Sequence, residues 1–182
     1  MGHTGSRPAC SASNLMEISY SPQQNPNLTE LENFFEDVFD DLDDNEAFTE
    51  DQDQALNEWF SMEEMVSYFL HGQLFEARSQ DNQLIGAVFI GKQNPISWPD
   101  GKKMEVFILG VNKKYRKIGV AKQLMILAEE FATRHKAKKI VVNTHVAMSS
   151  VHRFYQNIGY KKMGVLANYY DNGDAVFFQK IL

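Results

Sequence analysis

The chain of 182 residues has a single cysteine, Cys10, and no long run of apolar residues. One cysteine excludes an intrachain disulfide, which indicates a reducing compartment. No apolar run reaches the roughly 18 residues of a membrane-spanning helix, and the N-terminus lacks the apolar core of a signal peptide. We therefore expect a protein of the cytoplasm.

Metal-ligand and glycine-rich motifs are also missing. The five histidines show no spacing typical of metal ligands, and the cysteine is far from them in the sequence, so no metal is expected. The glycine spacings of a P-loop or a dinucleotide fingerprint do not occur. Basic residues do not alternate with aromatic residues as on many nucleic-acid-binding surfaces, so no nucleic-acid partner is expected.

Charge is divided unevenly along the chain. Residues 1–101 hold 19 acidic and 3 basic side chains, whereas residues 102–182 hold 5 acidic and 15 basic ones. Within residues 36–53, 10 of 18 side chains are acidic. A basic half suits a polyanionic ligand, and an acidic segment suits a cationic substrate, although a solvated helix face or loop is the simpler explanation of the acidic run.

The hydrophobic pattern predicts a flexible leader, residues 1–14, followed by one α/β domain, residues 15–182. Helices are expected at residues 27–39, 54–70, 120–135 and 149–158. Strands are expected at residues 15–21, 73–79, 84–91, 104–111, 139–145, 160–170 and 175–182. The order of helices and strands predicts a mixed sheet, and Asp171-Asn-Gly-Asp174 predicts a closing hairpin.

The most informative stretch is residues 111–121, between a predicted strand and a predicted helix. Backbone N–H groups in the first turn of a helix have no intrahelical acceptor, so they point toward an anion. Gly119 allows close approach of the backbone, and Arg116, Lys117 and Lys122 add positive charge. The stretch predicts a diphosphate ligand, although an ordinary connection with solvated lysines has the same composition.

Two motifs follow one another across the next predicted strand: Arg116-x-x-Gly119-x-Ala121 and Phe154-Tyr155-x-x-x-Gly159-Tyr160. Together they resemble the GNAT superfamily of acyl-CoA N-acyltransferases, whose central signature is Gln/Arg-x-x-Gly-x-Gly/Ala. The resemblance implies an α/β fold with a mixed, mostly antiparallel sheet of about seven strands and about four helices. It also implies acetyl-CoA as co-substrate and an amine as acceptor.

The resemblance implies that acetyl-CoA lies along the central strand and the loop after it. The residues implied to bind it are Leu109, Val111, Arg116, Lys117, Ile118, Gly119, Val120, Ala121, Lys122 and Ser150. Backbone groups of Leu109 and Val111 would pair with the pantetheine amides beside a strand bulge, expected at Gly110. Met148 stands where many family members carry an asparagine, and Ser149 or Ser150 is the expected substitute.

Two residues are implied to be catalytic. Glu105 lies eleven residues before Arg116, where GNAT histone acetyltransferases place a general-base glutamate. Acting through water, it would take the amine proton; a surface glutamate is the alternative. Tyr155 matches the family tyrosine that donates a proton or a hydrogen bond to the coenzyme A sulfur; a core aromatic is the alternative.

Four residues are expected to contact the acceptor: Asn143, His145, Tyr169 and Tyr170. Asn143 and His145 share one face of their predicted strand, where either would contact substrate, relay a proton or be a satisfied core residue. The tyrosine pair resembles that of the protein N-terminal acetyltransferases, a branch of the same superfamily in which paired tyrosines grip the peptide backbone. Strand alternation sends the two rings to opposite faces, so at most one is expected to line the site.

These features predict a cytoplasmic acetyl-CoA-dependent N-acetyltransferase that works by direct attack of a primary amine, without an acyl-enzyme. The acceptor stays open: a protein N-terminus or lysine fits the tyrosine pair, and a polyamine or aminoglycoside fits the acidic stretch. A non-catalytic acyl-CoA-binding module is the alternative to an enzyme. We expect a monomer or homodimer without membrane association beyond the myristoylation pattern of Gly2 and Ser6, which a plain disordered tail also explains.

Overall fold

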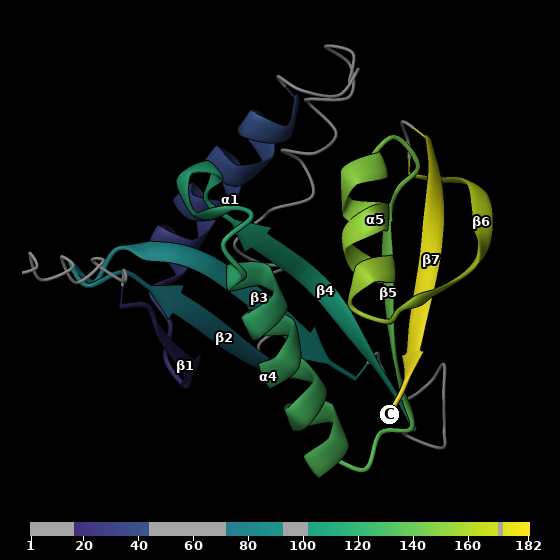
Figure 1. The fold of residues 1–182 in the computed structure, drawn as a ribbon, viewed down its shortest axis with the longest axis horizontal. Helices are drawn as coiled ribbons and strands as arrows, with labels where there is room; N and C mark the ends of the chain where they lie inside the picture. The colour runs from purple at the N-terminus through teal and green to yellow at the C-terminus, as the bar shows by residue number, and fades with distance from the viewer. Residues whose placement is uncertain (1–16, 44–71, 93–101, 171–172) are drawn as a thin grey trace, which may run out of the picture.

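The computed structural model describes residues 17–43, 72–92, 102–170 and 173–182 (Figure 1). Its elements are β1 (Ser19–Gln23), α1 (Leu28–Asp43), β2 (Gly72–Arg78), β3 (Leu84–Gly91), β4 (Lys103–Val111), the 3₁₀ turn η1 (Lys113–Tyr115), α4 (Val120–Arg134), β5 (Lys139–His145), α5 (Ser149–Asn157), β6 (Lys161–Tyr170) and β7 (Gly173–Ile181). The leader and the helix predicted at residues 54–70 lie outside the described residues.

The strands form one sheet of seven in the order β1-β2-β3-β4-β5-β7-β6. Every neighbouring pair is antiparallel except β4 and β5, which confirms the predicted mixed, mostly antiparallel sheet. β4 and β5 pair only over the four positions from Lys103↔Lys139 to Val106↔Val142, and beyond them the two strands diverge (Figure 1). The sheet therefore opens between its two halves at the carboxyl end of β4.

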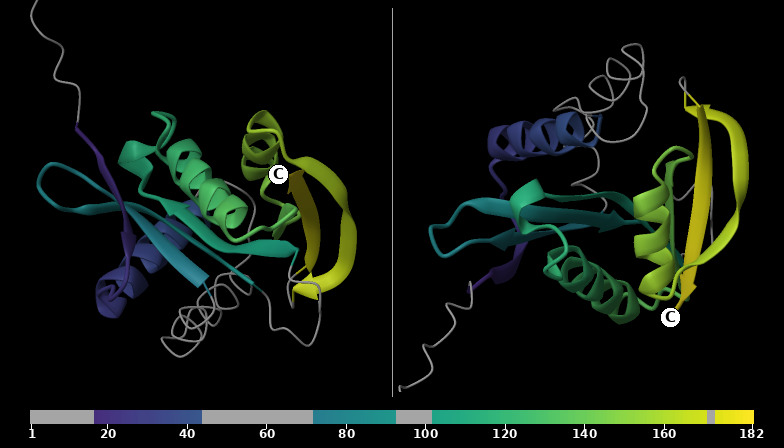
Figure 2. Two further views of the ribbon diagram at one scale, coloured as in Figure 1. Left: turned by 90° about the horizontal axis from the view of Figure 1, so that it is seen from below. Right: turned by 45° about the horizontal axis from the view of Figure 1, so that its top comes forward.

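Helices cover both faces of the β1–β4 half of the sheet. α4 packs against β2, β3 and β4, and α1 lies on the opposite face (Figure 2). β3 is buried along its whole length: Ile85, Val88 and Ile90 belong to the core cluster around α4, and Leu84, Ala87 and Phe89 to the cluster around α1. A strand covered on both faces reads as a continuous apolar run, as the sequence of β3 does.

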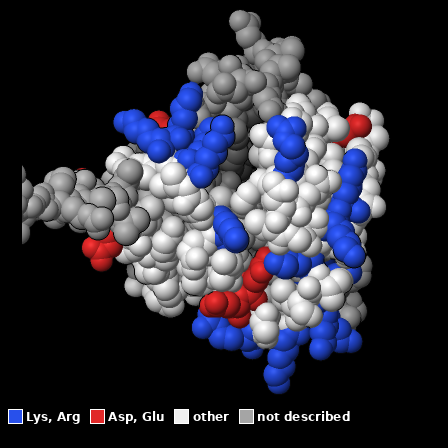
Figure 3. All heavy atoms as spheres, viewed as in Figure 1, with Lys and Arg blue, Asp and Glu red and all other residues white. Residues whose placement is uncertain are grey.

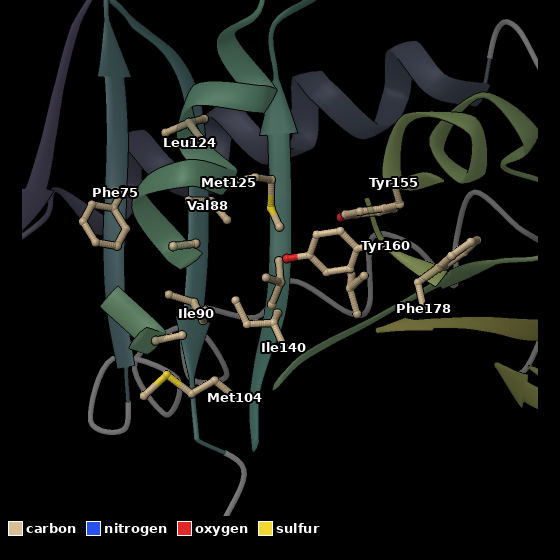
Figure 4. Packing of buried hydrophobic residues seen from close by; sticks show 14 of the residues in the cluster. Phe75, Val88, Ile90, Met104, Leu124, Met125, Ile140, Tyr155, Tyr160 and Phe178 are labelled. Carbon is tan, nitrogen blue, oxygen red and sulfur yellow. The ribbon is translucent and has the colours of Figure 1, made fainter. Parts of the chain in front are cut away.

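The core cluster around α4 also reaches the other half of the sheet (Figure 4). Leu124 and Met125 of α4 pack among β-strand residues, and Tyr155 of α5 packs against Tyr160 and Phe178, with ring centroids 5.5 and 5.9 Å away. Each large apolar side chain buried in this way contributes about 1.5–3 kcal/mol. Continuous packing therefore joins the two halves below the opening.

β1 differs from the strand predicted at residues 15–21: it begins at Ser19 and continues to Gln23. Its antiparallel ladder with β2, from Ser19↔Arg78 to Gln23↔Leu74, sets these bounds. Pro22 lies inside the ladder because β1 is at the edge of the sheet, where one side needs no partner strand.

The bulge expected at Gly110 is instead at Phe107, where the register with β3 passes from Phe89↔Ile108 to Ile90↔Val106. Gly110 is paired regularly with Ala87. A Cβ at Gly110 would lie 2.8 Å from Cε1 of Phe35. The glycine therefore permits close packing of α1 on β4, which the sequence pattern of the strand did not reveal.

Candidate active site

The N-terminus of α4 presents unpaired backbone donors. Its N-cap residue is Gly119, with φ +98°, and no side chain of the described residues caps the helix. A β-carbon at Gly119 would lie within 4 Å of no atom in the described part of the chain, so the left-handed backbone, and not lack of space, requires glycine. The N–H groups of the first turn, from Val120 to Lys122, have no intrahelical acceptor and are available to an anion.

A cavity of about 870 Å³ lies against this helix end, which is within the size range of small-molecule sites. The residues predicted to bind the co-substrate that line it are Leu109, Val111, Arg116, Lys117, Gly119, Val120, Ala121, Lys122 and Ser150. Ile118 is not among the lining residues and is 56% exposed. Met148 and Tyr155 line the opposite wall, so the two sequence motifs meet around one space.

Positive charge surrounds this cavity. Lys and Arg side chains gather over the segment between β4 and α4 (Figure 3), and Lys113, Lys117 and Lys122 line the cavity. The Arg116 side chain turns back into the protein: its Nε donates to the carbonyl of Val111 at 2.9 Å, and its Nη2 donates to that of Val38 at 3.4 Å. Arg116 thus ties the loop to β4 and α1.

α5 buries Tyr155 at the edge of the cavity, where the side chain is 3% exposed. In Figure 4 the ring lies between α5 and β4. Burial raises the pKa of the Tyr155 hydroxyl, and negative charge at Tyr170 would raise it further. The phenol therefore stays protonated at neutral pH and can act as a hydrogen-bond donor.

Glu105 is buried in β4, with 5% exposure, so it is not the surface glutamate of the alternative interpretation. Burial raises its pKa. Two groups oppose this rise: Lys103 Nζ at 3.6 Å from Oε2, and Asn143 Nδ2, which donates to Oε1 at 3.3 Å. A carboxylate of raised pKa is a better proton acceptor than an exposed one.

Asn143 follows the last β5 position that pairs with β4, so it faces the opening of the sheet. The Tyr170 hydroxyl donates a hydrogen bond to Asn143 Oδ1. His145 is buried nearby: its ring centroid is 5.6 Å from that of Tyr170, and its Nδ1 accepts from the backbone N–H of Ala147 at 3.2 Å. Three of the four predicted acceptor residues therefore cluster around the end of β5, and Asn143 connects this cluster to Glu105.

The fourth, Tyr169, joins them because β6 is irregular there. The β6–β7 register shifts between Leu166 and Tyr170, and Asn168 has φ +51°. The rings of Tyr169 and Tyr170 are perpendicular with centroids 5.0 Å apart. Burial raises the pKa of both hydroxyls, and the charge of Glu105 also raises both. The strand alternation that would separate the two rings does not hold at this point.

The predicted residues thus form two adjoining clusters. Glu105, Asn143, His145, Tyr169 and Tyr170 do not line the 870 Å³ cavity. Tyr155 links the two clusters: it lines the cavity, and negative charge at Tyr170 would raise the pKa of its hydroxyl. The roles of these residues remain predictions.

Some residues of the site were not predicted. On α5 and just after it, Val151, Phe154 and Ile158 line the cavity. Their spacing of three and four residues is a helical stripe that the sequence could have shown. Lys103 lies two residues before Glu105 on β4, so strand alternation could have placed the two side chains on one face. Val38 of α1 reaches the cavity wall through a contact distant in sequence and carries no local signal.

The model of the Acetyltransferase (GNAT) family matches residues 28–160. The chain belongs to the GNAT family. This confirms the family, and the class of enzyme, that the two motifs predict. No curated protein sequence matches this GNAT chain.

Solved structures of other acetyltransferases share the fold of this GNAT chain. They include the ribosomal-protein-S18-alanine N-acetyltransferase of Escherichia coli (TM-score 0.68, 12% identity, 91% of this chain and 94% of that chain). The PaiA N-acetyltransferase of Thermoplasma acidophilum in complex with coenzyme A matches with TM-score 0.71 and 16% identity over 90% and 99%. The NatC complex bound to Gag peptide and CoA matches with TM-score 0.68 and 21% identity over 92% and 99%.

Two further matches are shorter. The chain spans 63% of a protein named as a streptothricin acetyltransferase from Bacillus anthracis, in complex with acetyl coenzyme A, and 65% of a nourseothricin acetyltransferase. Identity is 22% in both cases, with TM-scores of 0.55 and 0.56. At these identities the likeness shows the fold alone.

Within the described ranges, no three His, Cys, Asp or Glu side chains come together as a metal ion would require. In the same ranges, no helix combines the length and the apolar character needed to cross a bilayer.

Proposed function

We propose that this GNAT protein transfers an acetyl group from acetyl-CoA to a primary amine, by direct attack of the amine on the thioester. The observation that carries the proposal is the shared cavity: the uncapped N-terminus of α4 and the buried hydroxyl-bearing Tyr155 line one space of about 870 Å³. The N-terminus of α4 can hold a diphosphate, and the Tyr155 hydroxyl can donate a hydrogen bond to a thiolate.

The cavity wall suits the co-substrate along its length. The N–H groups at the start of α4 and the side chains of Lys113, Lys117 and Lys122 offer hydrogen bonds and positive charge to the diphosphate. From Phe107 to Val111, β4 has no pairing with β5, since their ladder ends at Val106↔Val142. Backbone groups on that side of Leu109 and Val111 can pair with the pantetheine amides.

The reaction requires an uncharged amine. At pH 7 a lysine-like amine is free base in only about one molecule in 2,500, and a protein N-terminus in roughly a tenth. In the proposed step the amine nitrogen forms a bond to the carbonyl carbon, the carbon–sulfur bond breaks, and coenzyme A leaves as the thiolate. Glu105 accepts the amine proton, directly or through water, and Tyr155 donates a hydrogen bond or proton to the sulfur.

For the acceptor we favour a protein or peptide amine, N-terminal or lysine. Tyr169 and Tyr170 form an adjoining aromatic pair at the opening of the sheet, which suits a peptide backbone. The one carboxylate of this cluster, Glu105, already has Lys103 beside it, which weakens its attraction for a polycation. We also propose a cytoplasmic location, supported by the single cysteine.

A small polycation is the second candidate acceptor. It is favoured by α1, which brings Val38 to the cavity wall while the acidic run of residues 36–53 begins on the same helix. Exposed Glu36 and Asp37 would attract a cation toward this face.

Calorimetric titration with acetyl-CoA, followed by assays of thiol release with a peptide panel and a polyamine panel, tests the proposal. We expect binding and thiol release with peptides carrying free N-termini or lysines. Release with polyamines alone would favour the second acceptor class. Binding without release on either panel would indicate a non-catalytic acyl-CoA-binding module, and no binding would contradict the proposed co-substrate site.

A further inference from the structure

A row of side chains crosses the opening between β4 and β5. Tyr170 of β6 donates to Oδ1 of Asn143, and Nδ2 of Asn143 donates to Oε1 of Glu105 at 3.3 Å. Lys103 Nζ is 3.6 Å from the other carboxylate oxygen of Glu105. The row therefore joins β4, on one side of the opening, to β5 and β6 on the other.

The chemistry of the row fixes the direction of its central amide. A phenol hydroxyl donates to a carbonyl oxygen, and only the –NH₂ group of the amide can donate to a carboxylate. Asn143 therefore has one orientation in which both bonds form. In that orientation the Tyr170 hydrogen is committed to Asn143, so toward the opening the Tyr170 oxygen acts as an acceptor.

The titratable and charged groups that act on Glu105 come from β4 and β6. Lys103 of β4 favours the carboxylate, as does the Asn143 hydrogen bond. The hydroxyls of Tyr169 and Tyr170 on β6 interact with the charge of Glu105 and remain neutral near pH 7, because burial raises the pKa of both.

We propose that Asn143 is a positioning residue: it holds the Glu105 carboxylate and the Tyr170 hydroxyl at fixed places on the two sides of the opening, instead of contacting the acceptor itself. The catalytic consequence of this arrangement rests on the proposed acetyl transfer. The hydrogen-bonded row itself does not rest on that proposal, and its effect on the pKa of Glu105 can be measured without turnover.

The direct test is the pKa of the Glu105 carboxyl, measured by ¹³C NMR of protein with labelled glutamate and assigned with Glu105→Gln. Asn143→Ala should raise this pKa by about one unit, a tenfold change in the ionisation constant, since one donor to the carboxylate is lost. Tyr170→Phe should raise it by less, because the amide of Asn143 then loses the bond that orients it.

The matched control is Thr144→Val, the neighbouring position on β5. Thr144 is 7% exposed, and its hydroxyl has no hydrogen-bond partner in the part of the chain that the structure describes. The near-isosteric valine perturbs the same strand without touching the row and should leave the Glu105 pKa unchanged.

With an active acceptor, the low-pH limb of the kcat profile should move to higher pH in Asn143→Ala, while KM for acetyl-CoA stays unchanged. An unaltered Glu105 pKa in both Asn143→Ala and Tyr170→Phe, or an equal change in Thr144→Val, would overturn the inference. If Asn143→Ala does not fold, Tyr170→Phe decides alone. Absence of thiol release by the unaltered protein would contradict the proposed function, and the NMR titration would still decide the role of Asn143.

Discussion

Among the residues of the candidate site, Glu105 combines an ionisable group with nearly complete burial. Burial disfavours its charged form and raises the pKa of the carboxyl, while Lys103 and Asn143 limit the rise. The result is a base that titrates closer to neutral pH than an exposed glutamate. Two predictions at the residue scale follow from this combination.

Replacing Glu105 with glutamine should lower turnover by about 10²- to 10⁴-fold, the usual contribution of a general base. The loss should be larger for lysine-like amines than for N-terminal amines, because the former are almost entirely protonated at pH 7. Steady-state kinetics with matched peptides measures both, and calorimetry should show unchanged acetyl-CoA affinity. Equal losses for the two amine classes would argue against proton removal by this residue.

Glu105→Gln should also change how the free energy of unfolding depends on pH. The folded-state pKa of Glu105 is raised above its unfolded value, so the folded state holds the proton more tightly. The stability contributed by this group is therefore present at low pH and is lost as pH rises from about 4, the ordinary glutamate pKa, through the folded pKa. The free energy of unfolding of Glu105→Gln, relative to the unaltered protein, should rise across this window by about 1.4 kcal/mol per unit of pKa shift. Chemical denaturation at several pH values measures it, and a constant difference would contradict the prediction.

Among the elements, the N-terminus of α4 depends on one backbone conformation. Gly119→Ala places a side chain at φ +98°, which costs about 1–3 kcal/mol of strain. We expect weaker acetyl-CoA binding, by roughly tenfold or more, since the first-turn N–H groups lose their alignment. Calorimetry measures the affinity.

Gly164→Ala is the control for this change. A Cβ at Gly164 of β6 would likewise lie within 4 Å of no atom among the residues that the structure describes, but the φ of Gly164 is not in the left-handed region. It should leave affinity unchanged. Similar affinity loss in both variants would show that added bulk, and not the turn, matters.

The elements themselves were largely predictable, because helical and strand periodicities are local. β3 and β5 have the predicted bounds, and the Arg116–Ala121 loop leads into α4 as expected. The irregularities were not predictable. The bulge at Phe107 and the register shift before Tyr170 depend on how each strand pairs with its neighbour, which the periodicity of a single strand does not show. The bond from Tyr170 to Asn143 joins β6 to β5, which are not neighbours in the sheet. Those irregularities assemble the second cluster of the site.

For the whole molecule, the separation of charge along the chain becomes a basic surface around the cavity (Figure 3). Lys122→Gln on the first turn of α4 should weaken acetyl-CoA binding about two- to fivefold at low ionic strength, the effect of losing one exposed ion pair with the diphosphate. The difference should shrink at high salt. The control is Lys162→Gln, an exposed position on β6 that does not line the cavity. Titrations at two salt concentrations measure both, and an effect independent of salt would exclude the charge as its cause.

The short ladder between β4 and β5 has a consequence for how the protein persists in a cell. Only four residue pairs join the strands, so the facing edges beyond them have no partner strand in the described sheet. If the pantetheine arm of acetyl-CoA lies between those edges, its amides take the hydrogen-bonding positions that a further strand would occupy. At a hundred times its dissociation constant acetyl-CoA would add about 2.7 kcal/mol to the free energy of unfolding. Free coenzyme A carries the same arm, so the stability of the folded protein, and with it its resistance to proteases, would follow the total concentration of coenzyme A in both forms.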